Sequence, residues 1–161
     1  MSDTKIELIG ADKLTAKLSR ISVFLRGQVA KEAVHAGGLQ VQNHARINIT
    51  RSGKFSRHQT GGLANSIKTT SRTVQNGGEA EVVVHKVYAR IQEFGGTIRP
   101  LPSNTRGLLI WRDPDTGKVH AAKKVTLPAR PYLRPAMTEN QSDILGAMEK
   151  VIDSYLQSEA E

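Results

Sequence analysis

Few side chains in this sequence have the types and spacing that catalysis or metal binding requires. Glu32 and His35 lie three residues apart in a stretch predicted to be helical, and His44 follows nine residues later. Helical zinc motifs usually place two histidines four residues apart, so this spacing favours ordinary surface positions. His58 lies near Ser56, but no carboxylate is spaced to orient a serine-histidine pair. The chain has no cysteine, which excludes a thiolate nucleophile and a disulfide.

Acidic residues are equally scarce where an enzyme would need them. Glu93 precedes Phe94-Gly95-Gly96, but a phosphate-binding loop needs a longer glycine spacing and a following Lys and Ser or Thr. Residues 51–137 contain only five acidic residues, and two of them, Asp113 and Asp115, belong to a predicted turn. We therefore expect a protein that is not an enzyme and that uses neither a cofactor nor a metal.

Charge is segregated along the chain. Residues 1–50 carry seven Lys/Arg and four Asp/Glu (+3), residues 51–137 carry fifteen and five (+10), and residues 138–161 carry one and six (−5), which together give the net charge of +8. A basic middle and an acidic tail indicate either a surface that binds a polyanion or head-to-tail pairing between copies. The alternative is a solvated surface whose charge happens to be uneven.

Nucleic acid is the first polyanion to consider. Cations that can neutralise phosphates fall in predicted loops and hairpins. They are Arg51, Lys54, Arg57, Arg99, Arg106, Arg112, Lys118, Lys123 and Lys124. Only Phe55 and Trp111 lie among them, so the sequence does not indicate a stacking platform for single strands. The pattern is compatible with non-specific DNA contact and not with sequence-specific regulation.

The length and hydropathy pattern predict one domain without a membrane segment. A chain of 161 residues can bury roughly 70% of the surface that its unfolded form exposes. No apolar run approaches the roughly 18 residues that span a bilayer, and the first residues do not resemble a signal peptide. We expect a protein that is made in a cytoplasm.

The N-terminal half is predicted to be mainly helical. Residues 5–9 favour a short strand, and Asp12 is a plausible N-cap for a helix that reaches about Thr50, with a break or continuation at Gly37-Gly38. Residues 51–62 have no periodicity and predict a flexible basic loop, before a helical turn at 63–66. The apolar stripe of the helix is formed by Leu14, Leu18, Ile21, Leu25 and Val29.

The second half alternates strands and short helices. Strands at 67–74 and 79–84 flank Asn76-Gly77-Gly78, the strongest short hairpin signal. A helix at 87–94 should end in a left-handed cap at Gly95-Gly96. Residues 108–112 and 118–125 flank the turn at 113–117 and predict a second hairpin.

The C-terminal part combines a proline-rich segment with a helix. Pro128, Pro131 and Pro135 predict irregular structure up to about Met137. A final helix should begin near Thr138 or Ser142 as N-cap. Its apolar face is formed by Ile144, Leu145, Met148, Val151, Ile152, Tyr155 and Leu156.

Together these elements predict an α+β fold in a single domain over 1–161. A small, mostly antiparallel sheet would carry the long N-terminal helix and the C-terminal helix packed on it. The basic loop at about 51–62 and a protruding β-hairpin at about 106–124 do not fit a compact core. Long excursions of this kind usually contact a neighbour.

Three runs of residues, taken in order, resemble one protein family. They are T-G-G-L-A-N-S-I at 60–67, Y-A-R-I-Q-E-F-G-G-T-I-R-P at 88–100 and V-T-L-P-A-R-P-Y-L-R-P-A-M at 125–137. They are similar to the tail-component or tail-completion (head-tail joining) proteins of long-tailed bacteriophages, including the related virion-morphogenesis proteins. The residues that match the family pattern are Gly62, Leu63, Ser66, Ile67, Tyr88, Glu93, Phe94, Gly95, Gly96, Arg130, Pro131, Tyr132, Leu133, Pro135 and Ala136.

The resemblance implies a structural protein of a virion or prophage, made in the host bacterial cytoplasm. Such proteins assemble as a ring, typically of six copies, at the head-proximal end of the tail. The expected partners are further copies of the chain, the tail-tube protein, the head connector or stopper protein, and DNA in the lumen through non-specific contacts; no membrane is expected. The length of the 106–124 hairpin leaves the tail type, contractile or not, open.

Two sets of residues follow from this interpretation. Phe94 and Tyr132 are expected to be buried anchors. The residues expected at the interface with other copies or partners are Arg51, Lys54, Phe55, Arg57, Arg106, Trp111, Arg112, Lys123 and Lys124. The alternative function is that of a small, basic, non-specific nucleic-acid-binding protein.

Overall fold

The protein is described from a computed structural model that covers residues 19, 22–23, 27–51, 53, 57–75, 77–102, 106–113 and 116–159, with the backbone alone for 57–60. The strand predicted at 5–9 and the N-cap predicted at Asp12 lie outside these residues. The described chain falls into two compact units. The first unit comprises Met1–Val41, Thr69–Val83 and Asn140–Glu161, and the second comprises Gln42–Lys68 and Val84–Glu139. The prediction of one domain over 1–161 remains a prediction.

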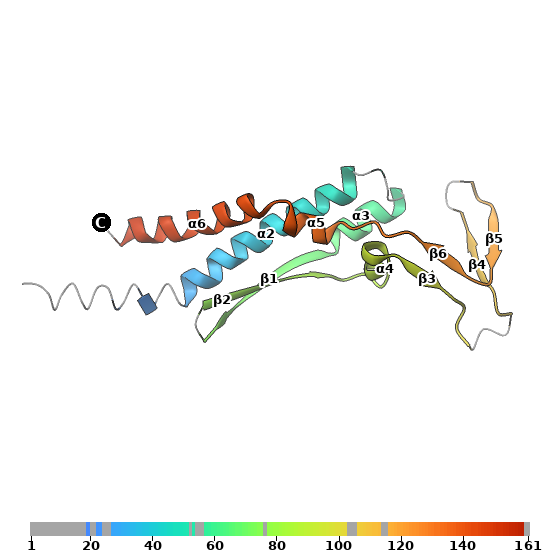
Figure 1. Ribbon diagram of the computed structural model, residues 1–161, viewed down its shortest axis with the longest axis horizontal. Helices are drawn as coiled ribbons and strands as arrows, with labels where there is room; N and C mark the ends of the chain where they lie inside the picture. Colours follow the sequence, from blue (N-terminus) through green and yellow to red (C-terminus); the bar gives the residue numbers. More distant parts are fainter. Residues whose placement is uncertain are drawn as a thin grey trace, which may run out of the picture. The chain divides into compact units, whose positions relative to one another are not determined.

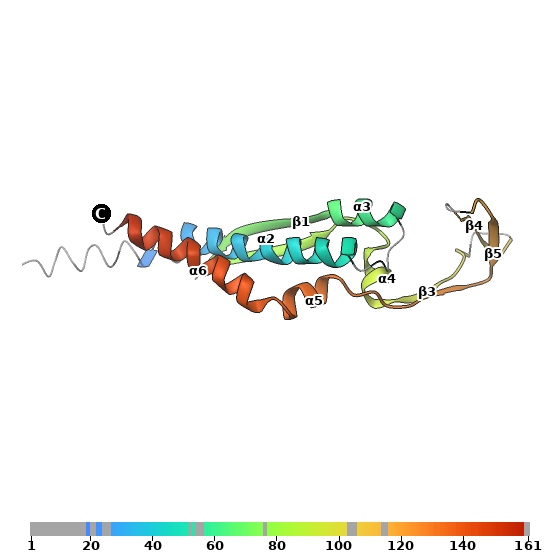
Figure 2. The ribbon, with the colours of Figure 1, turned by 90° about the horizontal axis from the view of Figure 1, so that it is seen from above.

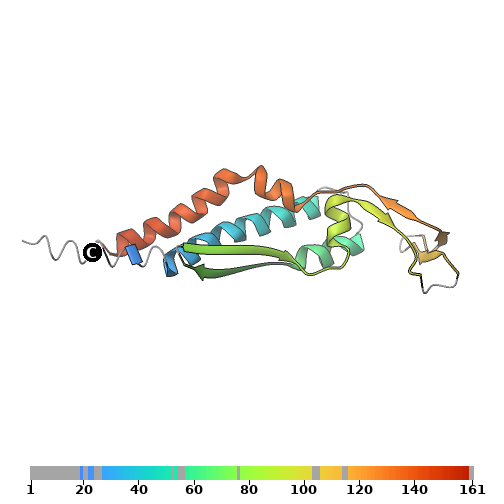
Figure 3. The same cartoon turned by 60° about the horizontal axis from the view of Figure 1, so that its bottom comes forward.

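The first unit has three layers. The first part of helix α2 (Gln28–Arg51) lies between helix α6 (Gln141–Ser158) and the hairpin of strands β1 (Ile67–Val74) and β2 (Gly77–Val84), as Figure 3 shows. Of the apolar stripe predicted for this helix, only Val29 lies within the described residues, and it is buried. The order β1-β2 confirms the predicted first hairpin.

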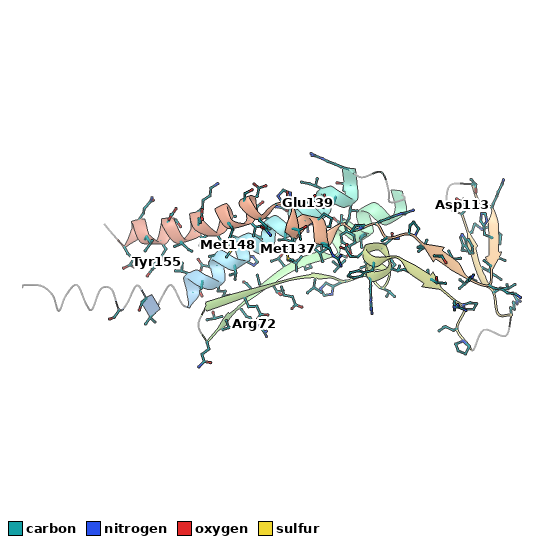
Figure 4. All side chains as sticks on the ribbon, viewed as in Figure 1. Arg72, Asp113, Met137, Glu139, Met148 and Tyr155 are labelled. Atoms are coloured by element: carbon teal, nitrogen blue, oxygen red, sulfur yellow. The ribbon has the colours of Figure 1, made fainter. Side chains whose placement is uncertain are left out.

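Two adjacent glycines let α2 pack closely against both α6 and β1. A Cβ on Gly37 would lie 3.0 Å from the side chain of Met148 on α6, which Figure 4 labels. A Cβ on Gly38 would lie 2.6 Å from the methyl group of Thr69 on β1, whose hydroxyl donates a 3.2 Å hydrogen bond to the Gly38 carbonyl. The helix continues through Gly37-Gly38. At these two positions the missing side chains allow close packing on two sides of the helix.

The first hairpin also depends on a glycine, although not for its turn. Strand β2 begins at Gly77, two residues earlier than predicted. A Cβ on Gly78 would lie 2.5 Å from the carbonyl oxygen of Ala30 and 2.7 Å from the Cα of Lys31, so β2 and α2 approach each other backbone to backbone. On the exposed side of the hairpin, Arg72 and Glu79 form a 2.9 Å ion pair across the strands, which contributes little to stability.

The second unit is built from short elements around the end of α2. They are helix α3 (Arg57–Asn65), helix α4 (Ala89–Phe94), strands β3 (Gly96–Ile98), β4 (Leu109–Arg112), β5 (Val119–Ala122) and β6 (Val125–Leu127), and helix α5 (Leu133–Thr138), all visible in Figure 1. The buried side chains of Ile49, Leu63, Ile67 and Tyr132 form its core. The Arg46 guanidinium donates hydrogen bonds of 3.2 and 3.3 Å to the carbonyls of Ala64 and Ile67.

The α+β class is confirmed, and the strands of the described residues are distributed over three two-stranded sheets rather than one. Strands β3 and β6 pair antiparallel with Gly96 opposite Leu127, and both lie side by side in Figure 2. Strands β4 and β5 pair antiparallel with Trp111 opposite His120, which confirms the predicted second hairpin.

Several predicted boundaries were wrong. The chain is helical from Arg57, where a loop was expected through residue 62. Gly95 ends α4 at φ 69° and ψ −177°, a region open almost only to glycine but distinct from the left-handed cap that was predicted. Asn140, not Thr138 or Ser142, is the N-cap of α6, and its side chain makes no capping hydrogen bond.

The proline-rich segment was predicted to be irregular up to about Met137. That prediction was wrong, because the segment contains helix α5. Pro135 is the third residue of this helix. The N–H groups of the first turn have no acceptor within their own helix, so proline is tolerated there. The rule that prolines interrupt helices therefore does not apply at this position.

Substitution of Gly78 by Ala should destabilise the protein by about 1–3 kcal/mol, because the backbone of α2 leaves no room for a methyl group. Gly146→Ala is the matched control, since a Cβ there meets nothing within 4 Å and helix propensity predicts a gain of about 1 kcal/mol. Denaturant unfolding followed by circular dichroism measures both. A Gly78→Ala protein as stable as the wild type would contradict the close approach of β2 to α2.

Candidate assembly interface

The carboxylate of Glu93 joins the two longest motif runs. One carboxylate oxygen accepts the backbone N–H groups of Tyr132 and Leu133 at 2.8 and 2.9 Å, and the other accepts that of Arg134 at 2.9 Å. These N–H groups open helix α5, whose own N-cap residue, Tyr132, provides no side-chain cap. Glu93 is buried. Because its carboxylate accepts these three N–H groups, it acts as a helix cap supplied from a distant part of the sequence.

Backbone contacts strengthen the same junction. The N–H of Arg130 donates a 2.7 Å hydrogen bond to the carbonyl of Gln92, and the side-chain amide of Asn48 on α2 donates one of 3.0 Å to the carbonyl of Tyr132. A Cβ on Gly95 would lie 2.7 Å from the nitrogen of Ala129, so only glycine permits this approach. No local pattern indicates this role of Asn48, since its partner lies 84 residues away.

The run at 60–67 belongs to the same core. Leu63 and Ile67 are fully buried, and the Ser66 hydroxyl donates to the Leu63 carbonyl at 2.7 Å. A Cβ on Gly62 would lie 3.3 Å from the hydroxyl oxygen of Tyr88. The three runs that carry the family resemblance thus meet in one unit, where they position its backbone.

Tyr132 is the buried anchor that was predicted. Burial, the Glu93 carboxylate and Tyr88 together raise its pKa from 10.0 to about 12. Phe94 is not an anchor, because 60% of its surface is exposed, and the prediction was wrong there. The Arg134 guanidinium lies over the Phe94 ring, 5.6 Å from its centre, so the ring is covered by a cation rather than by the core.

The β4–β5 hairpin is largely exposed, since three of the four residues in each strand are exposed. Because facing residues of an antiparallel pair share one side, its register places Ile110, Arg112, Val119 and Ala121 on one face, defined here as the outer face. All four are exposed, Ile110 to 52% and Val119 to 61%. The opposite face carries Trp111 stacked on His120, with ring centres 5.4 Å apart.

Hydrogen bonds between the residues on either side of the turn close this hairpin. The N–H of Asp113, labelled in Figure 4, donates to the Lys118 carbonyl and its carbonyl accepts from Gly117 N–H, both at 2.8 Å. Gly117 has a φ of 68°, as this turn requires. The Arg112 guanidinium donates to the Gly117 carbonyl at 3.3 Å, which keeps the cation beside the outer face.

The predicted interface residues are only partly brought together. Arg106, Trp111, Arg112, Lys123 and Lys124 are exposed on and around the β4–β5 hairpin. Arg51 is exposed at the end of α2 and Arg57 begins α3, where its side chain is not described. Lys54 and Phe55 lie outside the described residues. The role of all nine predicted residues as an interface remains a prediction.

Helix α6 adds a surface that the sequence interpretation missed. Its predicted apolar face was too wide, because Leu145 and Leu156 are 56% and 41% exposed. Glu149 and Asp153 lie between them at helical spacing and are also exposed. These four residues define the α6 strip, about a third of a turn away from Ile144 and Met148, which pack toward Gly37. Helical-wheel angles could have separated the two faces.

Within the described ranges, no group of three or more His, Cys, Asp or Glu side chains could hold a metal ion. None of the described helices combines the length and the apolar character that crossing a membrane requires.

Replacing Glu93 tests the remote cap. Glu93→Gln should cost about 2 kcal/mol, since an amide nitrogen cannot accept an N–H, and Glu93→Ala about 4 kcal/mol, since all three N–H groups then lose their acceptor. Glu81→Gln, at an exposed position on β2, is the matched control and should change stability little. Denaturant unfolding gives the three values, and equal stabilities would refute the cap.

Tyr132 makes the protein sensitive to alkali. Its pKa is higher in the folded than in the unfolded protein, so its contribution is complete below about pH 10 and is lost as the pH rises to about 12. The loss should reach on the order of 2 kcal/mol. Unfolding free energies of the wild type and of Tyr132→Phe across this range should diverge, with only the wild type showing the extra decline. Parallel curves would contradict the assignment.

Comparison with known proteins identifies the family. Residues 12–95, slightly more than half of the chain, match the family described as "Bacteriophage HK97-gp10, putative tail-component". The match includes the run at 60–67 and most of the run at 88–100, but not the β4–β5 hairpin or helices α5 and α6. Comparisons with curated proteins and with solved structures gave no match. This chain belongs to the HK97-gp10-like family of bacteriophage tail components, which are structural proteins of the virion.

Proposed function

We propose that this protein is a tail-completion subunit. Copies assemble as a ring, most simply of six, at the head-proximal end of the tail, where the ring joins the tail-tube protein to the head connector or stopper protein. In this role the protein binds and positions other proteins and catalyses no reaction. Membership of a family of structural tail components supports the proposal.

The observation that carries the proposal is the β4–β5 hairpin. Its outer face exposes Ile110 and Val119, and its other face exposes part of Trp111. A two-stranded hairpin of this length has marginal stability by itself in water. Exposed apolar side chains on both faces therefore favour a hairpin that another protein covers in the assembled particle.

A second candidate function rests on the cations of the same region. Arg112, Lys118, Lys123 and Lys124 are exposed, and the chain has a net charge of +8. They could neutralise the phosphates of DNA without reading its sequence. This function predicts an affinity for duplex DNA that falls steeply with salt and that does not depend on Ile110 or Val119.

Native mass spectrometry of the full-length protein, alone and with the tail-tube protein of the same phage, tests the proposal. We expect a closed ring in at least one of the two samples, and loss of the ring when Ile110 and Val119 are both replaced by Ser. Lys118→Ala with Lys123→Ala and Lys124→Ala should weaken DNA binding more than ring formation. A strict monomer in both samples, combined with salt-dependent DNA binding, would favour the second candidate.

A further inference from the structure

The outer face of the β4–β5 hairpin needs a partner of defined chemistry. It presents two apolar side chains, Ile110 and Val119, with Arg112 directly opposite Val119 in the register. The segment from 106 to 124 contains five Lys/Arg and two Asp/Glu, a net charge of +3. A matching surface would combine apolar side chains with carboxylates over a similar short length.

The α6 strip has this chemistry. Leu145 and Leu156 expose apolar surface at its two ends, and Glu149 and Asp153 place carboxylates between them. Helix α6 carries three Asp/Glu and one Lys, a net charge of −2. None of its residues is fully buried, so its packing in the first unit uses only one side of the helix.

We infer that the outer face of the hairpin of one copy docks on the α6 strip of the neighbouring copy. This inference rests on the ring proposed above and names the two surfaces that would form it. Ile110 and Val119 contact Leu145 and Leu156, while the Arg112 guanidinium pairs with the Glu149 or Asp153 carboxylate.

A contact of this kind suits a ring. The two surfaces differ, so each copy offers one of each to its two neighbours, and a heterologous contact closes into a ring when the rotation per copy allows it. Opposite charges raise the encounter rate and fix the orientation, while the apolar side chains provide the non-directional part of the stability. Self-association should consequently weaken as salt rises.

Charge exchange tests the pairing. Arg112→Glu and Glu149→Arg should each weaken self-association about tenfold or more, because each places like charges in contact, and the double variant should recover to within about threefold of the wild type. Lys86→Glu, at an exposed cation in the same unit that belongs to neither proposed surface, is the matched control. Sedimentation at two salt concentrations gives the affinities, and circular dichroism checks that each variant is folded.

Cross-linking tests the geometry without relying on affinity. The chain has no cysteine, so single-cysteine variants are specific probes. Val119→Cys and Leu145→Cys chains with different tags are mixed, assembled with the tail-tube protein, and treated with a short bismaleimide. The heterodimer should form in the mixture, and a mixture of exposed Val87→Cys with Leu145→Cys should give at most a trace.

The outcomes of these two experiments distinguish a failure of the inferred contact from a failure of the proposed function. Mixed-tag cross-links together with charge-exchange recovery support the inference. A ring in the wild type without these cross-links, or cross-links from Val119→Cys to the tail-tube protein instead, overturns the inference and leaves the ring intact. A monomer under all conditions overturns both the inference and the proposed function.

Discussion

The hydrogen bonds from three backbone N–H groups to the Glu93 carboxylate are the contact on which the second unit depends. Helix α5 has only six residues, and a helix of that length does not persist by propensity alone. Its first turn is stable here because a buried carboxylate satisfies the N–H groups that every helix leaves free. The same contact holds the backbone of Tyr132 where its side chain enters the core, and Gly95 lets the chain leave α4 beside this segment.

Small residues provide the corresponding constraint in the first unit. Gly37, Gly38 and Gly78 remove side chains at the points where α6, β1 and β2 approach α2. Close packing at these points needs little apolar area, which agrees with a chain that has only 4% aromatic residues. It also leaves α6 covered on one side only. The α6 strip is therefore exposed because α6 packs on α2 through one face only.

Local signals predicted a large part of the fold. Periodicity and turn residues indicated α2, both hairpins, α4 and α6, because these elements follow from residues close together in sequence. Helix α5 and the start of α3 could not be predicted in this way. Helix α5 depends on a cap from Glu93, 39 residues before Tyr132, and the local proline rule indicated irregular structure. The cation over the exposed Phe94 ring likewise comes from a distant residue, Arg134, which only the folded chain brings there.

The residues that carry the family resemblance and the residues that are candidates for assembly are different sets. Gly62, Glu93, Gly95 and Tyr132 position backbone within the second unit, so they explain why a family pattern can be recognised. Positions with that role constrain the fold and say little about which surface meets a neighbour. The candidate contacts, the outer face of β4–β5 and the α6 strip, lie outside the matched residues 12–95. The candidate contacts consequently rest on the exposure, register and charge of residues in this chain.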